Sequence, residues 1–195
     1  MNSKLCMAGL VIALAGVAQA QQQPAAPQAN PITAAFKTRL LASHRNIAQA
    51  FDSIPASKFD YKPTPAQLSI GFIAQHVASD DYLFCNTFGD MKANIPAADV
   101  STPDSVKAKW PKEELVSKLK ASFAFCAQAM GQLTDASLAD SVSLILAGSK
   151  RTTTRINTVL IHALDLADHY GQLANYMRLI NLVPPTALPR PKPGA

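Results

Sequence analysis

The placement of proline restricts how this chain can fold more than any other feature of the sequence. The fourteen prolines lie near the termini, in connections or at the start of a helical pattern, and none falls in the interior of four long stretches. In these stretches apolar residues recur at intervals of three, four and seven, the period of an amphipathic helix. We therefore predict helices at about residues 32–53, 69–90, 110–133 and 152–181.

These four segments favour an all-α fold, a four-helix bundle, because no other part of the sequence shows a convincing pair of strands. Residues 134–150 are ambiguous and suit either an extended segment or the approach to the last helix. Within the last helix we expect four apolar side chains to face the core: Leu160, Leu164, Leu173 and Met177.

The first twenty residues have the order of a bacterial secretion signal. Lys4 provides a positive start, residues 5–17 are almost wholly apolar, and residues 18–20 (AQA) fit the small-x-small pattern that a signal peptidase cuts. The apolar stretch is shorter than the ~20 residues that span a bilayer, which disfavours the alternative of an uncleaved membrane anchor. We expect a mature chain that begins near Gln21 and is periplasmic or secreted, without a stable membrane anchor.

The composition divides the chain into four parts. They are a signal peptide at 1–20, a Pro/Gln-rich linker at 21–31, a helical domain at 32–183 and a Pro-rich tail at 184–195. The formal net charge is +5, but the basic residues are scattered, without the dense stripe of a nucleic-acid-binding surface. We expect a small-molecule substrate and no nucleic-acid partner. A homodimer is compatible with a bundle of this kind.

Two cysteines, Cys85 and Cys126, remain after removal of the expected signal peptide. An oxidising compartment favours a disulfide between them, whereas two buried thiols would behave as small apolar residues. A bond requires their helices to be adjacent, with Cα atoms within ~7 Å of each other. The sequence leaves both alternatives open.

Side chains suited to bind a metal cluster in the last helix. Asp165 and His169 are four residues apart, so they share one helical face and can converge on one ion. The natural third donor is His76, in the middle of the second helix. Two imidazoles and one carboxylate suit a divalent transition metal (Zn, Ni, Mn or Fe) and leave the open positions that a catalytic ion needs. The alternative interpretation is that these histidines are simply packed or exposed.

Three further side chains lie near this cluster in the sequence. His162 precedes His169 by seven residues, about 10 Å along a helix, so the two cannot bind one ion directly. We expect His162 to support the ligands and Asp168 to face away from them. Tyr170 and His162 are candidates for proton transfer.

The sequence resembles the DinB/YfiT-like family in a series of segments that follow the family order. The matching segments are residues 59–65 (FDYKPTP), 69–71 (SIG), 75–78 (QHVA), 168–173 (DHYGQL), 176–178 (YMR) and 184–185 (PP). The resemblance extends over residues 34–185, which is most of the expected mature chain.

This resemblance implies a four-helix bundle that holds a metal with three histidines, one from the second helix and two from the fourth. His76 and His169 match the first and last of these, and Asp165 stands at the middle position, where the family usually has histidine. Characterised relatives imply thiol-dependent chemistry, so we expect an exported, metal-dependent, thiol-transferase-like transferase or hydrolase. The aspartate motivates the alternative, a non-catalytic periplasmic binding or scaffold protein that has lost its metal.

Overall fold

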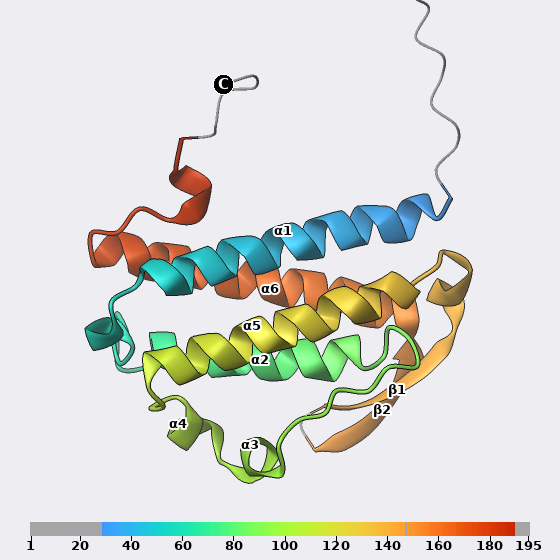
Figure 1. The fold of residues 1–195 in the computed structure, drawn as a ribbon, viewed down its shortest axis with the longest axis horizontal. Helices are drawn as coiled ribbons and strands as arrows, with labels where there is room; N and C mark the ends of the chain where they lie inside the picture. Colours follow the sequence, from blue (N-terminus) through green and yellow to red (C-terminus); the bar gives the residue numbers. More distant parts are fainter. Residues whose placement is uncertain (1–28, 147, 190–195) are drawn as a thin grey trace, which may run out of the picture.

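Four long helices run side by side in the computed structural model, which describes residues 29–146 and 148–189 (Figure 1). They are α1 (Pro31–Ser53), α2 (Ile70–Cys85), α5 (Lys112–Ala129) and α6 (Arg155–Leu179). Both α1 and α2 pack against α5 and α6, so the four helices enclose one core. The predicted four-helix bundle is confirmed.

Parts of the expected organisation lie outside the described residues. These are the signal peptide, most of the linker and the last residues of the tail. Within the described part of the chain, no helix combines the length and the hydropathy needed to cross a membrane.

The start of α1 is held by a residue that is distant in the sequence. The Asp135 carboxylate accepts hydrogen bonds from the backbone N–H groups of Ile32 at 3.1 Å and Thr33 at 2.8 Å, and from the Thr33 hydroxyl at 2.9 Å. Burial works to raise the pKa of Asp135, but these hydrogen bonds outweigh it and hold the pKa below its ordinary value of 3.8. Asp135, which lies in the connection between α5 and α6, therefore caps the start of α1.

The α2 helix begins where the sequence predicts but ends at Cys85 instead of near residue 90. Its N-cap is Ser69, whose hydroxyl accepts a hydrogen bond from the backbone N–H of Phe72 at 3.2 Å. After the helix, the side-chain oxygen of Asn86 accepts a hydrogen bond from the backbone N–H of Ala93 at 2.8 Å. This turn interrupts the helix before its apolar pattern ends.

A hairpin precedes α6. Its strands β1 (Ser141–Leu146) and β2 (Ser149–Thr154) are antiparallel, and Gly148 in the turn has a φ of 74°, which glycine adopts without strain. The expectation that the chain has no clear strand pair is therefore wrong. The run of threonines at 152–154 explains the difference, because β-branched residues favour a strand over a helix.

The connection between α2 and α5 runs alongside these two helices, from the end of α2 back to the start of α5 (Figure 1). It contains the short helices α3 (Ala97–Ser101) and α4 (Asp104–Lys107). Gly71 of α2 lies against the backbone of Ala108, just after α4, and a Cβ atom at position 71 would overlap the Ala108 carbonyl oxygen. Four 3₁₀ turns complete the described chain: η1 (Ala56–Lys58), η2 (Met130–Gln132), η3 (Ala136–Ala139) and η4 (Pro185–Ala187).

The core-facing side of α6 carries histidines as well as leucines. Leu173 and Met177 are fully buried, as predicted, whereas Leu160 and Leu164 are exposed, so the prediction is wrong for these two. The buried positions of α6 are Thr158, Val159, His162, Leu166, His169, Leu173, Ala174, Tyr176 and Met177. This stripe runs through both histidines, which places Leu160 and Leu164 on the outer face.

The two cysteines form a disulfide that joins α2 to α5. The Cα atoms of Cys85 and Cys126 are 5.2 Å apart, and both residues are fully buried. Of the two alternatives left open by the sequence, the structure contains the disulfide.

Candidate metal centre

The three side chains selected from the sequence lie together between α2 and α6. One ligand atom from each of His76, Asp165 and His169 lies within 4.8 Å of the others. The Nε2 atom of His169 is 3.2 Å from Oδ1 of Asp165, and the rings of His76 and His169 are nearly perpendicular, with centroids 4.7 Å apart. The helical spacing of the α6 pair and the packing of α2 on α6 produce this convergence.

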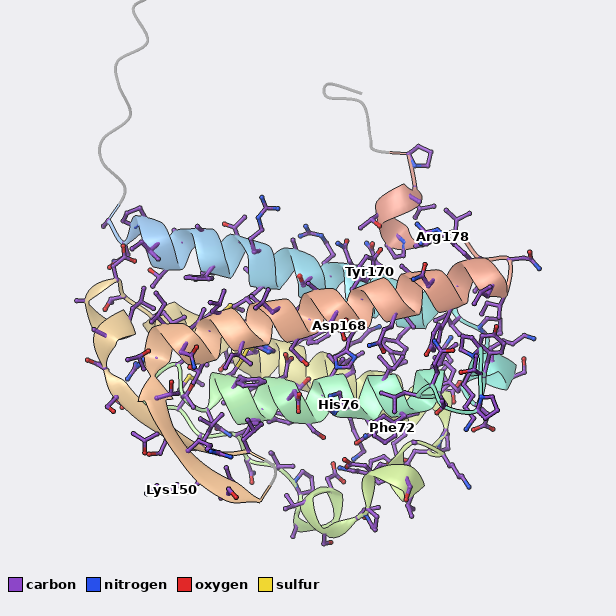
Figure 2. All side chains as sticks on the ribbon, turned by 180° about the vertical axis from the view of Figure 1, so that it is seen from behind. Phe72, His76, Lys150, Asp168, Tyr170 and Arg178 are labelled. Carbon is purple, nitrogen blue, oxygen red and sulfur yellow. A yellow bond between two sulfur atoms is a disulfide. The ribbon has the colours of Figure 1, made fainter. Side chains whose placement is uncertain are left out.

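This group is reachable from solvent on the His76 side. The exposed fraction of the side chain falls from 31% at His76 to 21% at Asp165 and 8% at His169. Figure 2 labels His76 on α2, the helix that lies beside α6 in this view. Oδ2 of Asp165 and Nδ1 of His169 are buried and have no hydrogen-bond partner among the described residues. The group thus combines an accessible edge with polar atoms that lack a partner.

A fourth side chain, Asp80, borders the group and was not selected from the sequence. Its Oδ2 atom is 3.5 Å from Nε2 of His76, one helical turn away on α2. Burial raises the pKa of Asp80, and the nearby Asp165 carboxylate adds to the rise, while His76 opposes it. The spacing of His76 and Asp80 repeats that of Asp165 and His169, so the same four-residue interval could have identified it.

Carboxylates dominate the electrostatics of this group. Burial works to lower the pKa of His169, but the hydrogen bond to Asp165 and the charges of Asp165, Asp168 and Asp80 outweigh it and raise the pKa. A positive charge is therefore stabilised at this position, whether it belongs to an imidazolium or to a bound cation.

The other side chains singled out around the cluster point elsewhere. Asp168 is exposed and accepts a hydrogen bond from the Gln172 amide at 2.8 Å. The Tyr170 hydroxyl donates to the Thr186 hydroxyl at 2.9 Å, and accepts from the Thr186 backbone N–H at 3.0 Å (Figure 2). Asp168 faces away as predicted, whereas the hydroxyl of Tyr170 is engaged by the segment that follows α6.

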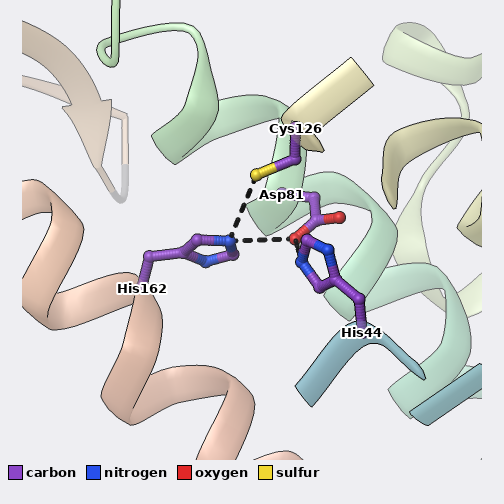
Figure 3. A group of neighbouring side chains, drawn as sticks. All are labelled: His44, Asp81, Cys126 and His162. Carbon is purple, nitrogen blue, oxygen red and sulfur yellow. Dashed lines mark hydrogen bonds and ion pairs between the residues drawn. The ribbon is translucent and has the colours of Figure 1, made fainter. Parts of the chain in front are cut away.

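A second group lies deeper in the bundle and forms a buried candidate metal site. Its members His44, Asp81, Cys126 and His162 come from α1, α2, α5 and α6, and their ligand atoms lie within 4.8 Å of one another (Figure 3). Oδ1 of Asp81 is 3.1 Å from Nε2 of His44 and 3.0 Å from Nε2 of His162. The Ser122 hydroxyl donates to Oδ2 of Asp81 at 3.1 Å.

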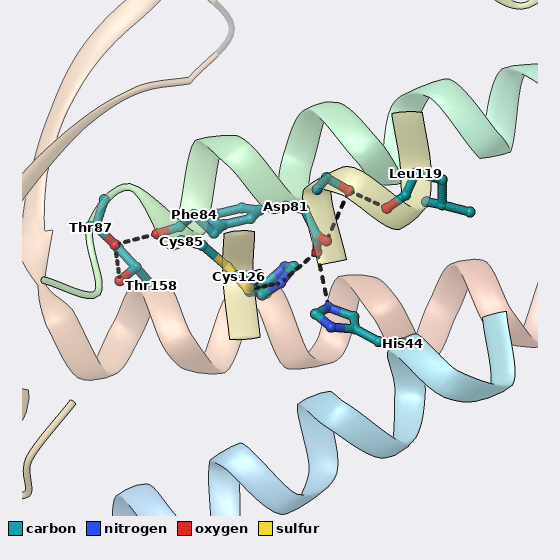
Figure 4. Close-up of a disulfide and its surroundings, with 10 residues drawn as sticks. His44, Asp81, Phe84, Cys85, Thr87, Leu119, Cys126 and Thr158 are labelled. Atoms are coloured by element: carbon teal, nitrogen blue, oxygen red, sulfur yellow. Dashed lines mark hydrogen bonds and ion pairs between the residues drawn. A yellow bond between two sulfur atoms is a disulfide. The ribbon is translucent and has the colours of Figure 1, made fainter. Parts of the chain in front are cut away.

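Asp81 holds this buried group together as an anion. Burial works to raise the pKa of Asp81, but the hydrogen bonds from His162 and His44 outweigh it, so the pKa lies below its ordinary value of 3.8. The sulfur of Cys126 is 3.8 Å from Nε2 of His162 and belongs to the disulfide with Cys85 (Figure 4). While that bond persists, Cys126 offers no thiolate, and the two histidines and Asp81 are the remaining donors.

Sequence reasoning missed this second group. His162 belongs to it, and not to the supporting shell of His169 as expected. Each member comes from a different helix, so no spacing along the chain connects them. The adjacent acids Asp80 and Asp81 even serve different groups, because consecutive residues point about 100° apart around a helix.

The fold and these two groups define a four-helix-bundle protein with candidate metal sites. The chain belongs to the DinB superfamily, whose family model matches residues 39–173. A comparison with curated protein sequences gives no match.

Solved structures show the same fold at low sequence identity. A DinB-like protein from Bacillus cereus ATCC 10987 is 14% identical, with a TM-score of 0.60 over 77% of this chain and 93% of that one. A DinB-like protein from Bacillus subtilis is 18% identical, with a TM-score of 0.58 over 80% of this chain and 96% of that one. A mycothiol-dependent maleylpyruvate isomerase is 14% identical, with a TM-score of 0.57 over 72% of this chain and 60% of that one.

Proposed function

We propose that this protein binds one divalent transition-metal ion through His76, Asp165 and His169, and that it is a metal-dependent transferase or hydrolase. The observation that carries the proposal is the convergence of these three ligands within 4.8 Å at a solvent-accessible edge. The buried, unpartnered Oδ2 atom of Asp165 supports it, because a bound cation would give this oxygen a partner.

The donor set fits the proposed ion. Two imidazoles and one carboxylate are a common set for Zn, Ni, Mn or Fe, and three protein ligands leave positions free for a small molecule. Aspartate at the middle position preserves a ligand where the family usually has histidine. Asp80 orients His76 from one helical turn away and adds negative charge, as carboxylates beside metal-bound histidines do.

The reaction class that best suits this arrangement is the transfer of a thiol to an electrophile. When bound, the ion would supply Lewis acidity that lowers the pKa of a thiol or a water molecule. The name of one structural relative, a mycothiol-dependent maleylpyruvate isomerase, supports a thiol as the co-substrate. The exposed edge of His76 gives such a molecule access, while the buried side of His169 and Asp165 keeps the ligands in place.

We also propose that the protein acts in the periplasm or outside the cell. The signal-like residues 1–20 motivate this localisation. The disulfide between Cys85 and Cys126 supports it, because disulfides persist in oxidising compartments. Cell fractionation and N-terminal sequencing should find the chain outside the cytoplasm, starting near Gln21. A chain that retains Met1 in the cytoplasm would contradict the proposal.

Elemental analysis of the purified protein, produced without a histidine tag and reconstituted with each candidate metal, tests the proposed site. We expect about one equivalent of metal in the parent protein and in Asp168→Ala, and little in Asp165→Ala. Asp168 is the matched control because it is an exposed acid on the same helix. His44→Ala reports on the buried group, so metal lost in this variant but kept in Asp165→Ala would refute the assignment and place the ion there.

Activity can then be measured with a low-molecular-weight thiol and a chromogenic electrophile. Metal-loaded parent protein should accelerate the reaction, and Asp165→Ala should not. A protein that stays metal-free after reconstitution would instead be a helical-bundle binding or scaffold protein that has lost its metal.

A further inference from the structure

The buried group of His44, Asp81, Cys126 and His162 has nearly the distances of a closed, four-coordinate metal site. Around a tetrahedral zinc ion with bonds of about 2.0–2.3 Å, neighbouring ligand atoms lie roughly 3.3–3.6 Å apart. Here Oδ1 of Asp81 is 3.1 Å from Nε2 of His44 and 3.0 Å from Nε2 of His162 (Figure 3). The sulfur of Cys126 is 3.8 Å from Nε2 of His162. Small shifts of these side chains would therefore place four ligand atoms around one ion.

The charge of the group depends on the state of Cys126. In the disulfide the sulfur is uncharged, so an ion held by Asp81 and two neutral imidazoles would leave one unbalanced positive charge. A free Cys126 thiolate supplies a second anion, and the two anions together balance a divalent cation. This balance matters because Asp81, Cys126 and His162 are fully buried, where an uncompensated charge is strongly destabilising. Breaking the disulfide thus completes both the ligand set and the charge balance.

The neighbouring side chains hold the ligands in place. The ring of His44 stacks on the ring of Phe123, with centroids 4.1 Å apart. The Ser122 hydroxyl donates to Oδ2 of Asp81, which leaves Oδ1 to the two imidazoles. Nδ1 of His44 and Nδ1 of His162 have no hydrogen-bond partner among the described residues. The proton of each ring can therefore move from Nε2 to Nδ1, freeing Nε2 for an ion, without breaking a hydrogen bond at Nδ1.

Access to the group requires an opening of the bundle, because each of its members is at most 5% exposed. A cavity of about 270 Å³ lies beside α2, between α2, α5 and the connection that contains α3 and α4, and Ala78 and Tyr82 of α2 line it. These two residues are within one helical turn of Asp81, but Asp81 itself does not line the cavity. We therefore expect the ion to bind during folding, before the disulfide closes, or during transient opening of the reduced protein.

We propose that reduction of the disulfide creates a second metal site, which holds one zinc ion. Its ligands are His44, Asp81, Cys126 and His162. A dithiol reductant transfers two electrons and two protons: the bond between the sulfurs of Cys85 and Cys126 breaks, two thiols form, and the dithiol becomes a disulfide. The Cys126 thiol then loses its proton to solvent as its sulfur binds the ion. The same exchange in reverse removes the ligand and releases the ion.

The thiolate sets the choice of metal, because magnesium, calcium and manganese prefer oxygen ligands whereas zinc accepts sulfur and nitrogen. Four protein ligands also leave no open position, which is typical of a structural and not of a catalytic zinc ion. None of these ligands belongs to the group of His76, Asp165 and His169, so this inference does not rest on the proposed function.

The probe for the test is cobalt(II), since a thiolate bound to tetrahedral cobalt gives a charge-transfer band in the near ultraviolet. The full protein carries Asp165→Ala, which removes the exposed site, and it is refolded with cobalt in its oxidised form or after reduction by a phosphine, which contributes no thiol. The matched pair of variants is Cys85→Ser and Cys126→Ser. Both lack the disulfide and keep one thiol, but only Cys85→Ser keeps the proposed ligand.

We expect about one equivalent of cobalt and a charge-transfer band in the reduced protein, and in Cys85→Ser without any reductant. The oxidised protein and Cys126→Ser should show neither. Zinc should displace the cobalt and raise the Tm of Cys85→Ser but not of Cys126→Ser. Bands of equal strength in the two variants, or cobalt binding by the oxidised protein, would overturn the proposal. A reduced protein that shows no band, whether or not circular dichroism finds it folded, would overturn it as well, and this measurement requires neither cysteine variant to fold.

Discussion

Replacing Asp81 with alanine removes the carboxylate to which His44, His162 and Ser122 are hydrogen-bonded. The Ser122 hydroxyl keeps its second hydrogen bond, to the Leu119 carbonyl at 2.8 Å. The two histidines are almost fully buried and would lose the acceptor for their Nε2 atoms. Each buried group left without a partner costs about 1–3 kcal/mol, so we expect a loss of roughly 2–6 kcal/mol in the free energy of unfolding.

Thermal and urea unfolding, followed by circular dichroism, measure this loss. A change of 4 kcal/mol corresponds to a fall in Tm of about 8–16 °C for a domain of this size. Asp81→Asn should cost less, because an amide can accept from one imidazole and donate to the other. Asp168→Ala is the control and should change stability by less than about 0.5 kcal/mol, since Asp168 is exposed. A loss below about 1 kcal/mol for Asp81→Ala would refute the idea that this carboxylate organises the buried group.

The remaining predictions concern helix packing and capping. Leu166→Ala should cost about 2–5 kcal/mol in urea unfolding, whereas the same change at the exposed Leu164 should cost less than about 0.5 kcal/mol; similar losses would contradict the assigned core face of α6. Gly71→Ala should lower Tm because of the overlap with Ala108, while Gly171→Ala, which meets no atom within 4 Å, should stabilise α6 by about 0.5–1 kcal/mol; an increase in Tm for both would exclude the close approach. Asp135→Ala should lower Tm at pH 7. The native pKa of Asp135 is depressed, so its contribution is present above 3.8 and is lost as the pH falls below that value, and a Tm difference that persists unchanged at lower pH would rule out capping by the carboxylate.

The residues of the candidate site that the sequence predicted are mainly those whose proximity follows from their spacing along one helix. Asp165 and His169 are one helical turn apart, and that spacing alone brings them together once α6 forms. His76 could be added because it lies near the middle of a helix that had to pack against α6. Asp80 has the same kind of spacing and was available to the same argument.

The buried group and the hairpin were beyond this reasoning. The contacts between His44, Asp81 and His162 depend on which faces of three helices meet in the core, and periodicity gives the period of a helix more reliably than the direction of its buried face. The same uncertainty explains the misplacement of Leu160 and Leu164. In the hairpin, the β-branched threonines of β2 favour a strand locally, but their pairing with residues 141–146 is a contact between two segments that helical periodicity does not reveal.

The disulfide has a topological consequence for the cavity beside α2. Cys85 and Cys126 are 41 residues apart in the sequence, and the covalent ring that they close contains α3, α4 and most of α5. Closing a ring of this length removes chain entropy worth about 4 kcal/mol from the unfolded state. The segment with α3 and α4 is therefore part of a closed covalent ring. Because both ends of this ring meet at the disulfide, the segment can move away from α2 only as a closed loop. In the reduced protein the same segment is part of an open chain. Comparing amide hydrogen exchange of residues 86–111 between the oxidised and the reduced protein therefore measures how much the disulfide restricts the opening of the cavity.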